Sequence, residues 1–263
     1  MPIRFRSCVL SVALLFGCVS TASAEFAITA GAESFQWQEF TSAGRLLEES
    51  GHLFRAGAIW RERFAQEQML LELRGSGYFG RVDYDGQACD VFGPSCTPYR
   101  SDAEYRGIAA EATLARRFGR STGADLFAGG GFDTWRRDIK GDSNTAGVVE
   151  DWTVMYLLAG GGGHWEYTST RYEARAGFKY PFYARDTNHF YEVTVEPKGK
   201  PSFFARFSTD FMSAGRPRWG LTLYYDTYRF DQSNVQNVGF GLGVFQPRTE
   251  QDVIGLYALI YLP

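Results

Sequence analysis

The sequence lacks several features that would each point to a familiar class of protein. After residue 24, no uninterrupted apolar run approaches the roughly 20 residues that a membrane-spanning helix needs. Basic residues do not outnumber acidic ones, since 27 Lys and Arg stand against 30 Asp and Glu, so no nucleic-acid partner is expected. Histidine is scarce, with three residues. The glycine run 160–163 lies in an alternating stretch rather than before a helix, so it is not a phosphate-binding loop and no cofactor is expected.

The first residues read as an export signal, Met1–Ala24. Arg4 and Arg6 precede an apolar stretch, and Ala22-Ser23-Ala24 forms a small-residue cleavage pattern. Cleavage there predicts a mature chain that begins at Glu25 and forms one domain, residues 25–263. Two arginines and no acidic residue leave with the signal, so 25 basic and 30 acidic residues remain, a net charge of −5.

Cysteine is also scarce, with four residues, and two of these, Cys8 and Cys18, lie in the predicted signal. The other two, Cys89 and Cys96, lie in a segment rich in Gly, Pro, Asp and Ser, which predicts a disulfide in an oxidising compartment. Zinc binding is the alternative, but two cysteines without a nearby histidine pair fall short of the usual ligand count, so no metal is expected. A lipoprotein cleavage box at residues 15–18 is an alternative reading of the signal, although Phe16 fits it poorly.

Aromatic residues and glycine are abundant, with 22 Phe, 15 Tyr, 6 Trp and 30 Gly, and the apolar residues alternate along the chain. From Tyr172 to Phe182 every second residue is Tyr, Ala or Phe, and the residues between them are Glu, Arg, Gly, Lys and Pro. The same period of two recurs near residues 71–79 and 203–211. A side chain period of two predicts β-strands with one apolar face and one charged face.

Three observations favour a barrel in a membrane over a soluble β-sandwich. The alternating segments are long, about 12 to 16 residues, where globular strands are usually near five or six. Short connections alternate with long ones, which we place at 41–51, 86–104 and 139–150. Aromatic residues cluster near the strand ends, which is typical of girdles at two membrane interfaces; we assign to them Phe35, Trp37, Phe40, Trp165, Tyr167, Trp219, Tyr257 and Tyr261.

The pattern predicts an all-β fold, a transmembrane antiparallel up-and-down β-barrel of about ten strands, with eight to twelve possible. We expect the strands near 26–40, 52–65, 69–84, 105–118, 125–138, 151–167, 171–185, 201–212, 219–231 and 252–262. Two further segments, 191–196 and 238–245, would give twelve strands if both crossed the membrane; we interpret them as extensions of external loops.

These features resemble the small outer-membrane β-barrel proteins of Gram-negative bacteria. The resemblance covers the whole mature chain as a pattern, from the signal to the closing run Ile254–Leu262, although the last residue is Pro263 where that group typically ends on an aromatic. It implies location in the cell outer membrane, with outer-membrane lipid and lipopolysaccharide as partners.

The inward face of the predicted strands carries both signs of charge. A ten-stranded barrel leaves little free bore, so we expect a mutually paired polar plug rather than a selectivity filter. The predicted lumen network consists of Arg55, Glu72, Arg74, Glu111, Asp133, Arg137, Glu173, Arg175, Lys179, Arg206 and Asp210, with Arg61, Glu166 and Asp226 beside it.

An acidic pair at the external rim raises the possibility of catalysis. Asp83 and Asp85 share one face of a strand; they point outward if the alternation is strict, or inward if a bulge lies near Gly80. With Asp186 and His189 on another external loop, they resemble the paired Asp and Asp-His of omptins, ten-stranded outer-membrane proteases. The spacing departs from that family, because Asp186 and His189 are three apart where omptins have them two apart.

The sequence therefore leaves two main hypotheses on function. The favoured one is a non-enzymatic integral outer-membrane barrel that is structural, or that binds or passes small solutes at its external mouth in the manner of a porin. The alternative is an omptin-like rim hydrolase that uses Asp83, Asp85, Asp186 and His189.

Overall fold

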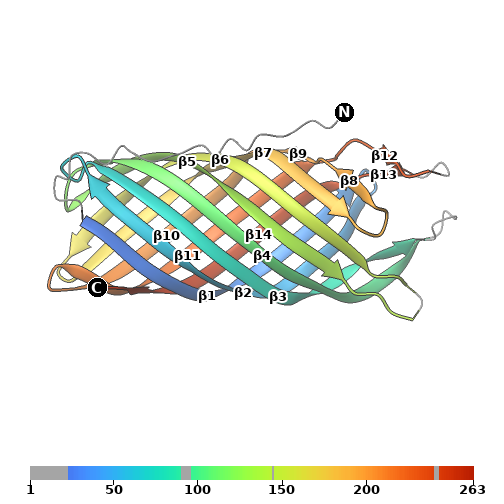
Figure 1. Cartoon of the computed structure of the whole chain (residues 1–263), viewed down its shortest axis with the longest axis horizontal. Helices are drawn as coiled ribbons and strands as arrows, with labels where there is room; N and C mark the ends of the chain where they lie inside the picture. The colour runs from blue at the N-terminus through green and yellow to red at the C-terminus, as the bar shows by residue number, and fades with distance from the viewer. Residues whose placement is uncertain (1–22, 90–95, 144, 240–242) are drawn as a thin grey trace, which may run out of the picture.

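The computed structural model describes residues 23–89, 96–143, 145–239 and 243–263 (Figure 1). Most of the predicted signal, residues 1–22, lies outside this part of the chain. The signal and its cleavage after Ala24 stay predictions.

Ten strands close into one antiparallel barrel, which confirms the predicted fold and strand count. Neighbours in the chain pair in sequence, and the ring closes through the pairs β1–β14 and β7–β10. The ten strands are β1 (Ser23–Thr41), β2 (Gly44–Phe64), β3 (Met69–Cys89), β4 (Cys96–Phe118), β5 (Thr122–Ile139), β6 (Val148–Tyr167), β7 (Thr170–Asn188), β10 (Ser202–Ser213), β11 (Arg216–Asp231) and β14 (Arg248–Tyr261).

Four short strands lie outside the ring. β8 (Val193–Val195) pairs with the end of β7, and β9 (Lys198–Gly199) pairs with β11. β12 (Gln236–Asn237) and β13 (Gly243–Val244) pair with each other. The described parts of the two ambiguous segments are therefore loop extensions, as the sequence predicted, and residues 240–242 lie outside the described chain.

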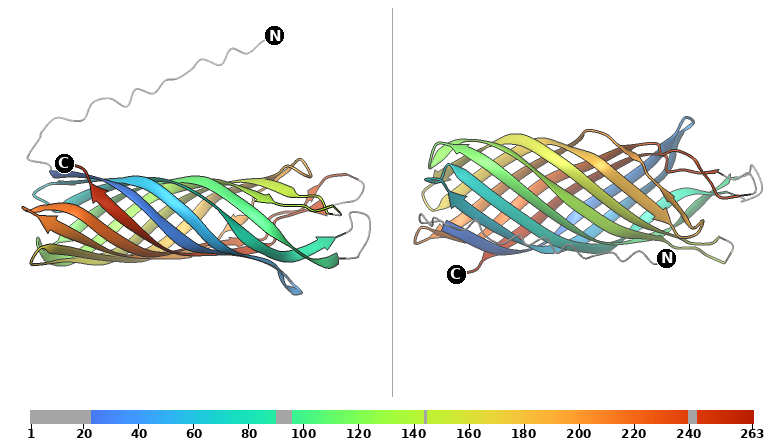
Figure 2. Two further views of the ribbon diagram at one scale, coloured as in Figure 1. Left: turned by 90° about the horizontal axis from the view of Figure 1, so that it is seen from below. Right: turned by 45° about the horizontal axis from the view of Figure 1, so that its top comes forward.

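The two ends of the barrel differ (Figures 1 and 2). At the turn end, β1 begins, β14 ends, and the connections are the short segments 65–68, 119–121, 168–169 and 214–215. The opposite end, the loop end, carries β8, β9, β12 and β13 (Figure 1). No helix among the described residues is long and apolar enough to cross a membrane.

The prediction of a long loop at residues 41–51 is wrong, because β1 and β2 remain paired as far as Thr41 and Gly44. The turn between them is tight: Gly44 has a φ of +123°, and the Ala43 N–H donates to the Thr41 hydroxyl. The added strand length holds because Leu47 and Glu49 point inward and are buried. The loop predicted at 86–104 is likewise mostly strand, since β3 runs to Cys89 and β4 starts at Cys96.

Apolar side chains cover the outside of the barrel. We call this the outer belt; it includes Phe54 (58% exposed), Phe79 (63%), Ile108 and Leu157. Its other large members are Phe26, Ile28, Leu73, Leu114, Leu126, Phe132, Met155, Phe178, Tyr180, Phe182, Phe203, Phe207, Leu221, Leu223, Ile254, Leu256 and Ile260. A continuous apolar surface of this size is incompatible with water and fits hydrocarbon.

Part of the predicted aromatic girdle is wrong. Trp165, Tyr167 and Trp219 are exposed near the turn end, as expected of a membrane interface. The side chains of Phe35, Trp37, Tyr257 and Tyr261 are buried. Odd-numbered residues of β1 and β14 point into the barrel, so these four aromatics fill the lumen.

A bulge changes the orientation of β7 near its loop end. Tyr156 of β6 pairs with Pro181, and Met155 pairs with Tyr183, so Phe182 is an extra residue. Before the bulge even-numbered residues face lipid, and after it Ala184 and Asp186 face the lumen and are buried. Proline in a strand commonly marks such a position.

The register places Cys89 directly opposite Cys96 on β3 and β4. Opposed residues of antiparallel strands have Cα atoms about 4.5 to 5.5 Å apart, which is within the range that a disulfide spans. The predicted disulfide therefore requires no change of backbone and stays a prediction.

Candidate functional site in the lumen

Charged side chains cross the lumen in three tiers. The first, the turn-end tier, is organised by two buried arginines. Arg61 donates to Glu72 at 2.6 Å, and Arg171 contacts both Asp210 and Glu25 at 2.8 Å. The Tyr261 hydroxyl donates to Asp210 at 2.7 Å. Every charge in this tier faces one of opposite sign, as burial requires.

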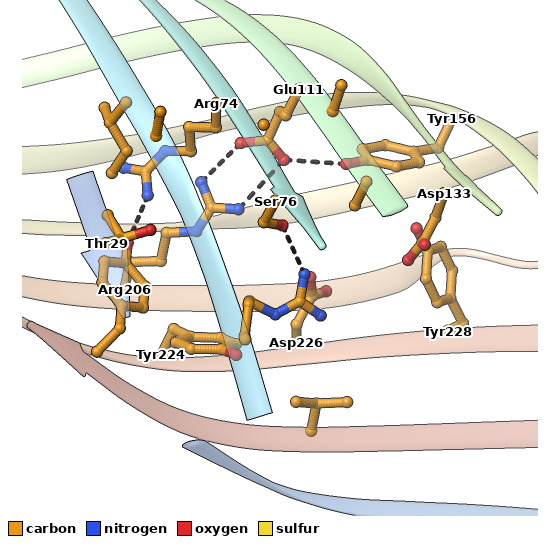
Figure 3. Close-up of a pocket in the computed structure, with 18 of the residues that line it drawn as sticks. Thr29, Arg74, Ser76, Glu111, Asp133, Tyr156, Arg206, Tyr224, Asp226 and Tyr228 are labelled. Atoms are coloured by element: carbon orange, nitrogen blue, oxygen red, sulfur yellow. Dashed lines mark hydrogen bonds and ion pairs between the residues drawn. The ribbon is translucent and has the colours of Figure 1, made fainter. Parts of the chain in front are cut away.

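The middle tier surrounds a cavity of about 110 Å³ (Figure 3). Arg206 binds Glu111 at 2.6 Å, and the Tyr156 hydroxyl donates to the same carboxylate at 3.2 Å. Arg55 donates to Ser76 at 2.8 Å and to Glu33 at 2.7 Å. The cavity is large enough to hold several water molecules.

The middle tier also places a cation against aromatic rings. The Lys179 ammonium lies 2.5 Å from Asp226 and 3.4 Å from the centroid of the Tyr228 ring. The Tyr78 hydroxyl donates to Asp133 at 2.8 Å. These contacts join β3, β5, β7 and β11 across the bore, so the tier fixes the shape of the lumen as well as filling it.

The third tier, the loop-end tier, is centred on Arg137. Its guanidinium donates to Glu49 at 2.7 and 3.0 Å, to Glu39 at 3.0 Å and to Glu150 at 2.8 Å. The Arg137 side chain is 1% exposed and that of Glu49 is fully buried. Tyr105 donates a short hydrogen bond to Glu49.

Three tryptophans pack beside Arg137. Trp135 and Trp152 stack with their ring centroids 5.4 Å apart and 5° between their planes, and Trp37 meets Trp152 edge-on at 5.1 Å. Trp37 donates to Glu39 at 2.9 Å. Together with Arg137 the three rings form a plug of aromatic and ionic contacts below the loop end.

Asp186 is the fourth carboxyl near Arg137, and one of its oxygens, Oδ1, has no hydrogen-bond partner. The residue follows the exposed Arg185 on β7, so it lies beyond the outer belt. Burial raises the pKa of the Asp186 carboxyl to about 9, and the nearby Glu150 carboxylate adds to the rise. No group of three or more His, Cys, Asp or Glu in the described part of the chain is arranged to hold a metal ion.

All eleven residues of the predicted lumen network are turned inward, and each has a partner. Besides the contacts above, Arg74 binds Glu72 at 2.7 Å and Arg175 binds Glu173 at 3.1 Å. Of the three residues predicted beside the network, Arg61 and Asp226 are paired in the lumen, while Glu166 is exposed near the turn end.

The four rim residues do not come together. Asp83 and Asp85 are exposed on the outer face of β3, where Asp85 pairs with Arg100 at 3.2 Å. Asp186 points into the lumen, and His189 Nε2 lies 2.7 Å from Asp151 Oδ2. The register shows no bulge near Gly80, so strict alternation holds there. The omptin-like hydrolase stays a hypothesis that this arrangement does not support.

Several residues of the lumen were not predicted from the sequence. Glu49 fell in a segment interpreted as a loop, and Glu150 fell at the edge of another. Glu33 and Glu39 lie at odd positions of β1, and the alternation of that strand could have identified them. The inward orientation of Asp186 could be predicted only by placing the bulge in β7, and Pro181 is the one local sequence feature that indicates this bulge.

A closed antiparallel barrel with a lipid-facing apolar surface and an ion-paired interior defines the class of this protein: a small integral β-barrel of the outer membrane. No family model matches the sequence, and no curated protein matches it. Among solved structures it is similar to the translocator domain of the autotransporter NalP from Neisseria meningitidis, with 11% identity, 89% of this chain and 88% of that chain covered, and a TM-score of 0.44.

Two further solved structures have similar values. The transport unit of the autotransporter AIDA-I from Escherichia coli has 10% identity, covers 93% of this chain and 92% of its own, and has a TM-score of 0.44. Ail, the attachment invasion locus protein of Yersinia pestis, in complex with a heparin analogue, has 10% identity, coverage of 91% and 99%, and a TM-score of 0.35. The chain's own barrel, and not these similarities, establishes the fold.

Proposed function

We propose that this protein is an occluded, non-enzymatic outer-membrane barrel. Its lumen is not an open pore, and its function resides at its external end. The loop-end tier is the observation that supports this proposal. Arg137, three carboxylates and three tryptophans occupy the bore from several strands at once, and each ionic contact would have to break before a solute could pass. Leaving one charge of a buried ion pair without its partner costs about 3 to 5 kcal/mol.

The interior below this plug is also paired. The turn-end and middle tiers neutralise their charges within the bore, so the described residues form no row of free side chains of one sign such as an ion pathway uses. The interior of an eight-stranded barrel is just filled by its own side chains. Two more strands enclose a wider lumen, and the aromatic rings of this lumen fill the added volume.

Conductance in a planar lipid bilayer tests the proposal. The refolded protein is expected to leave the bilayer silent under conditions in which a general porin gives clear steps. The variant Arg137→Ala tests whether the plug closes the lumen, and its conductance is expected to exceed that of the wild type. Reproducible steps from the wild-type protein would refute the proposal of an occluded barrel.

A further inference from the structure

Two arginines on the outer wall face each other without a shared acidic partner. Arg106 of β4 and Arg136 of β5 are directly opposed in the register, and both point outward. Like charges at opposed positions of antiparallel strands repel each other. Arg136 uses Nε and Nη2 to bind Asp151, both at 2.7 Å, and its Nη1 has no partner among the described residues. Arg106 forms no ion pair or hydrogen bond with any described residue.

This pair lies at the border of the outer belt. The next outward residue of β4 toward the turn end is Ile108, which is 55% exposed, and Phe79 of β3 lies opposite Arg106. Toward the loop end the outward residues are charged, beginning with Arg81 and Glu104, which bind each other at 2.6 Å. Arg106 and Arg136 therefore stand where hydrocarbon gives way to lipid headgroups.

A shallow groove in the wall leads from the arginines into the belt. Its apolar lining includes Ala56, Gly77, Phe79 and Ile108, and its charged lining consists of Arg106, Arg136 and Asp151, the last paired with Arg136. Gly77 leaves the floor bare: a Cβ atom there would meet nothing closer than 3.7 Å. The strands that form the groove, β2 to β5, lie side by side in the wall (Figure 2). The groove can hold an acyl chain, and among the described residues it ends at the unpaired Arg106 and at Arg136, whose Nη1 stays free beside its ion pair with Asp151.

We propose that Arg106 and Arg136 bind the phosphate monoester of an outer-leaflet lipid whose acyl chain lies in this groove. In the outer membrane the phosphorylated glucosamine headgroup of lipopolysaccharide, lipid A, has this chemistry. A doubly charged phosphate between the arginines converts their repulsion into two charge-assisted contacts, and the planar guanidinium suits it. The site lies on the outside of the barrel, so it does not depend on whether the lumen is closed.

Native mass spectrometry of the refolded full chain, incubated in micelles with purified lipid A, tests the site. The readout is the fraction of protein that retains lipid. A dephosphorylated lipid A gives the contribution of the phosphate, and inorganic phosphate as competitor distinguishes a lipid site from a site for the free anion. The wild type is expected to retain the phosphorylated lipid about tenfold more than the dephosphorylated one, the size of one charged hydrogen bond.

Arg106→Ala and Arg185→Ala form a matched pair of variants. Arg185 is also exposed and outward at the border of the belt, but it lies opposite Thr153 rather than another arginine. Arg106→Ala is expected to lose the preference for the phosphorylated lipid, and Arg185→Ala to keep it, with both barrels showing the same heat-dependent gel shift. Equal losses in the two variants, equal retention of both lipids by the wild type, or displacement by millimolar inorganic phosphate would overturn the proposal.

Discussion

Replacement of Arg137 by methionine removes the cation that the loop-end tier is built around. Four donated hydrogen bonds to Glu39, Glu49 and Glu150 are lost together. Methionine keeps most of the side-chain volume, so the expected effect is electrostatic rather than a cavity. Three buried carboxylates then remain without a counter-charge.

The structure supplies both the magnitude and a control. Removing one partner of a buried ion pair costs about 3 to 5 kcal/mol, because an uncompensated charge stays buried. The neighbouring substitution Arg136→Met breaks an outward pair with Asp151 whose side chains are 39% and 38% exposed. Exposed pairs contribute at most about 1 kcal/mol, so the two variants should differ by at least about 2 kcal/mol.

Urea unfolding of the barrel in lipid vesicles, followed by tryptophan fluorescence, measures the free energy of unfolding. Trp37 and Trp152 pack beside the substituted position and report directly on the loop-end tier. If Arg137→Met destabilises no more than Arg136→Met, the loop-end tier does not hold the barrel together and the reasoning fails.

Two other changes test single groups. Folding raises the pKa of Asp186 from 3.8 to about 9, so the stability that the protonated carboxyl provides is complete below pH 3.8 and is lost as the pH rises toward 9. At pH 8, Asp186→Asn should therefore unfold at higher urea than the wild type, by about 2 kcal/mol. This gain in the free energy of unfolding should vanish near pH 4. An unchanged pH dependence in this variant would contradict the assigned role. The opposed Cys89 and Cys96 should resist thiol labelling in the unreduced protein, and reduction should lower the free energy of unfolding by roughly 2 kcal/mol; full labelling before reduction would exclude the disulfide.

Much of this fold is readable from the sequence because its governing signal is local. Each strand carries its own period of two, since one face meets lipid and the other meets the lumen. The run from Tyr172 to Phe182 shows this directly, and each of the ten strands overlaps its predicted range, although β2, β3 and β4 extend further toward the loop end. The same parity placed Arg55, Glu72 and Arg206 on the inner face without knowledge of their partners.

The tertiary structure decided whatever depends on residues far apart in the chain. Arg137 meets Glu39 and Glu49 only because the ring closes with β1 and β2 across the lumen from β5. The hairpin that carries Glu49 continues through the segment predicted as a loop. Buried contacts inside the barrel stabilise the strand pairing there, and no pattern in the local sequence predicts them. Asp186 faces the lumen because one extra residue, Phe182, shifts the register of β7. A period of two fixes which face a side chain occupies, but a single bulge reverses it, and only the packing of neighbouring strands determines where that bulge lies.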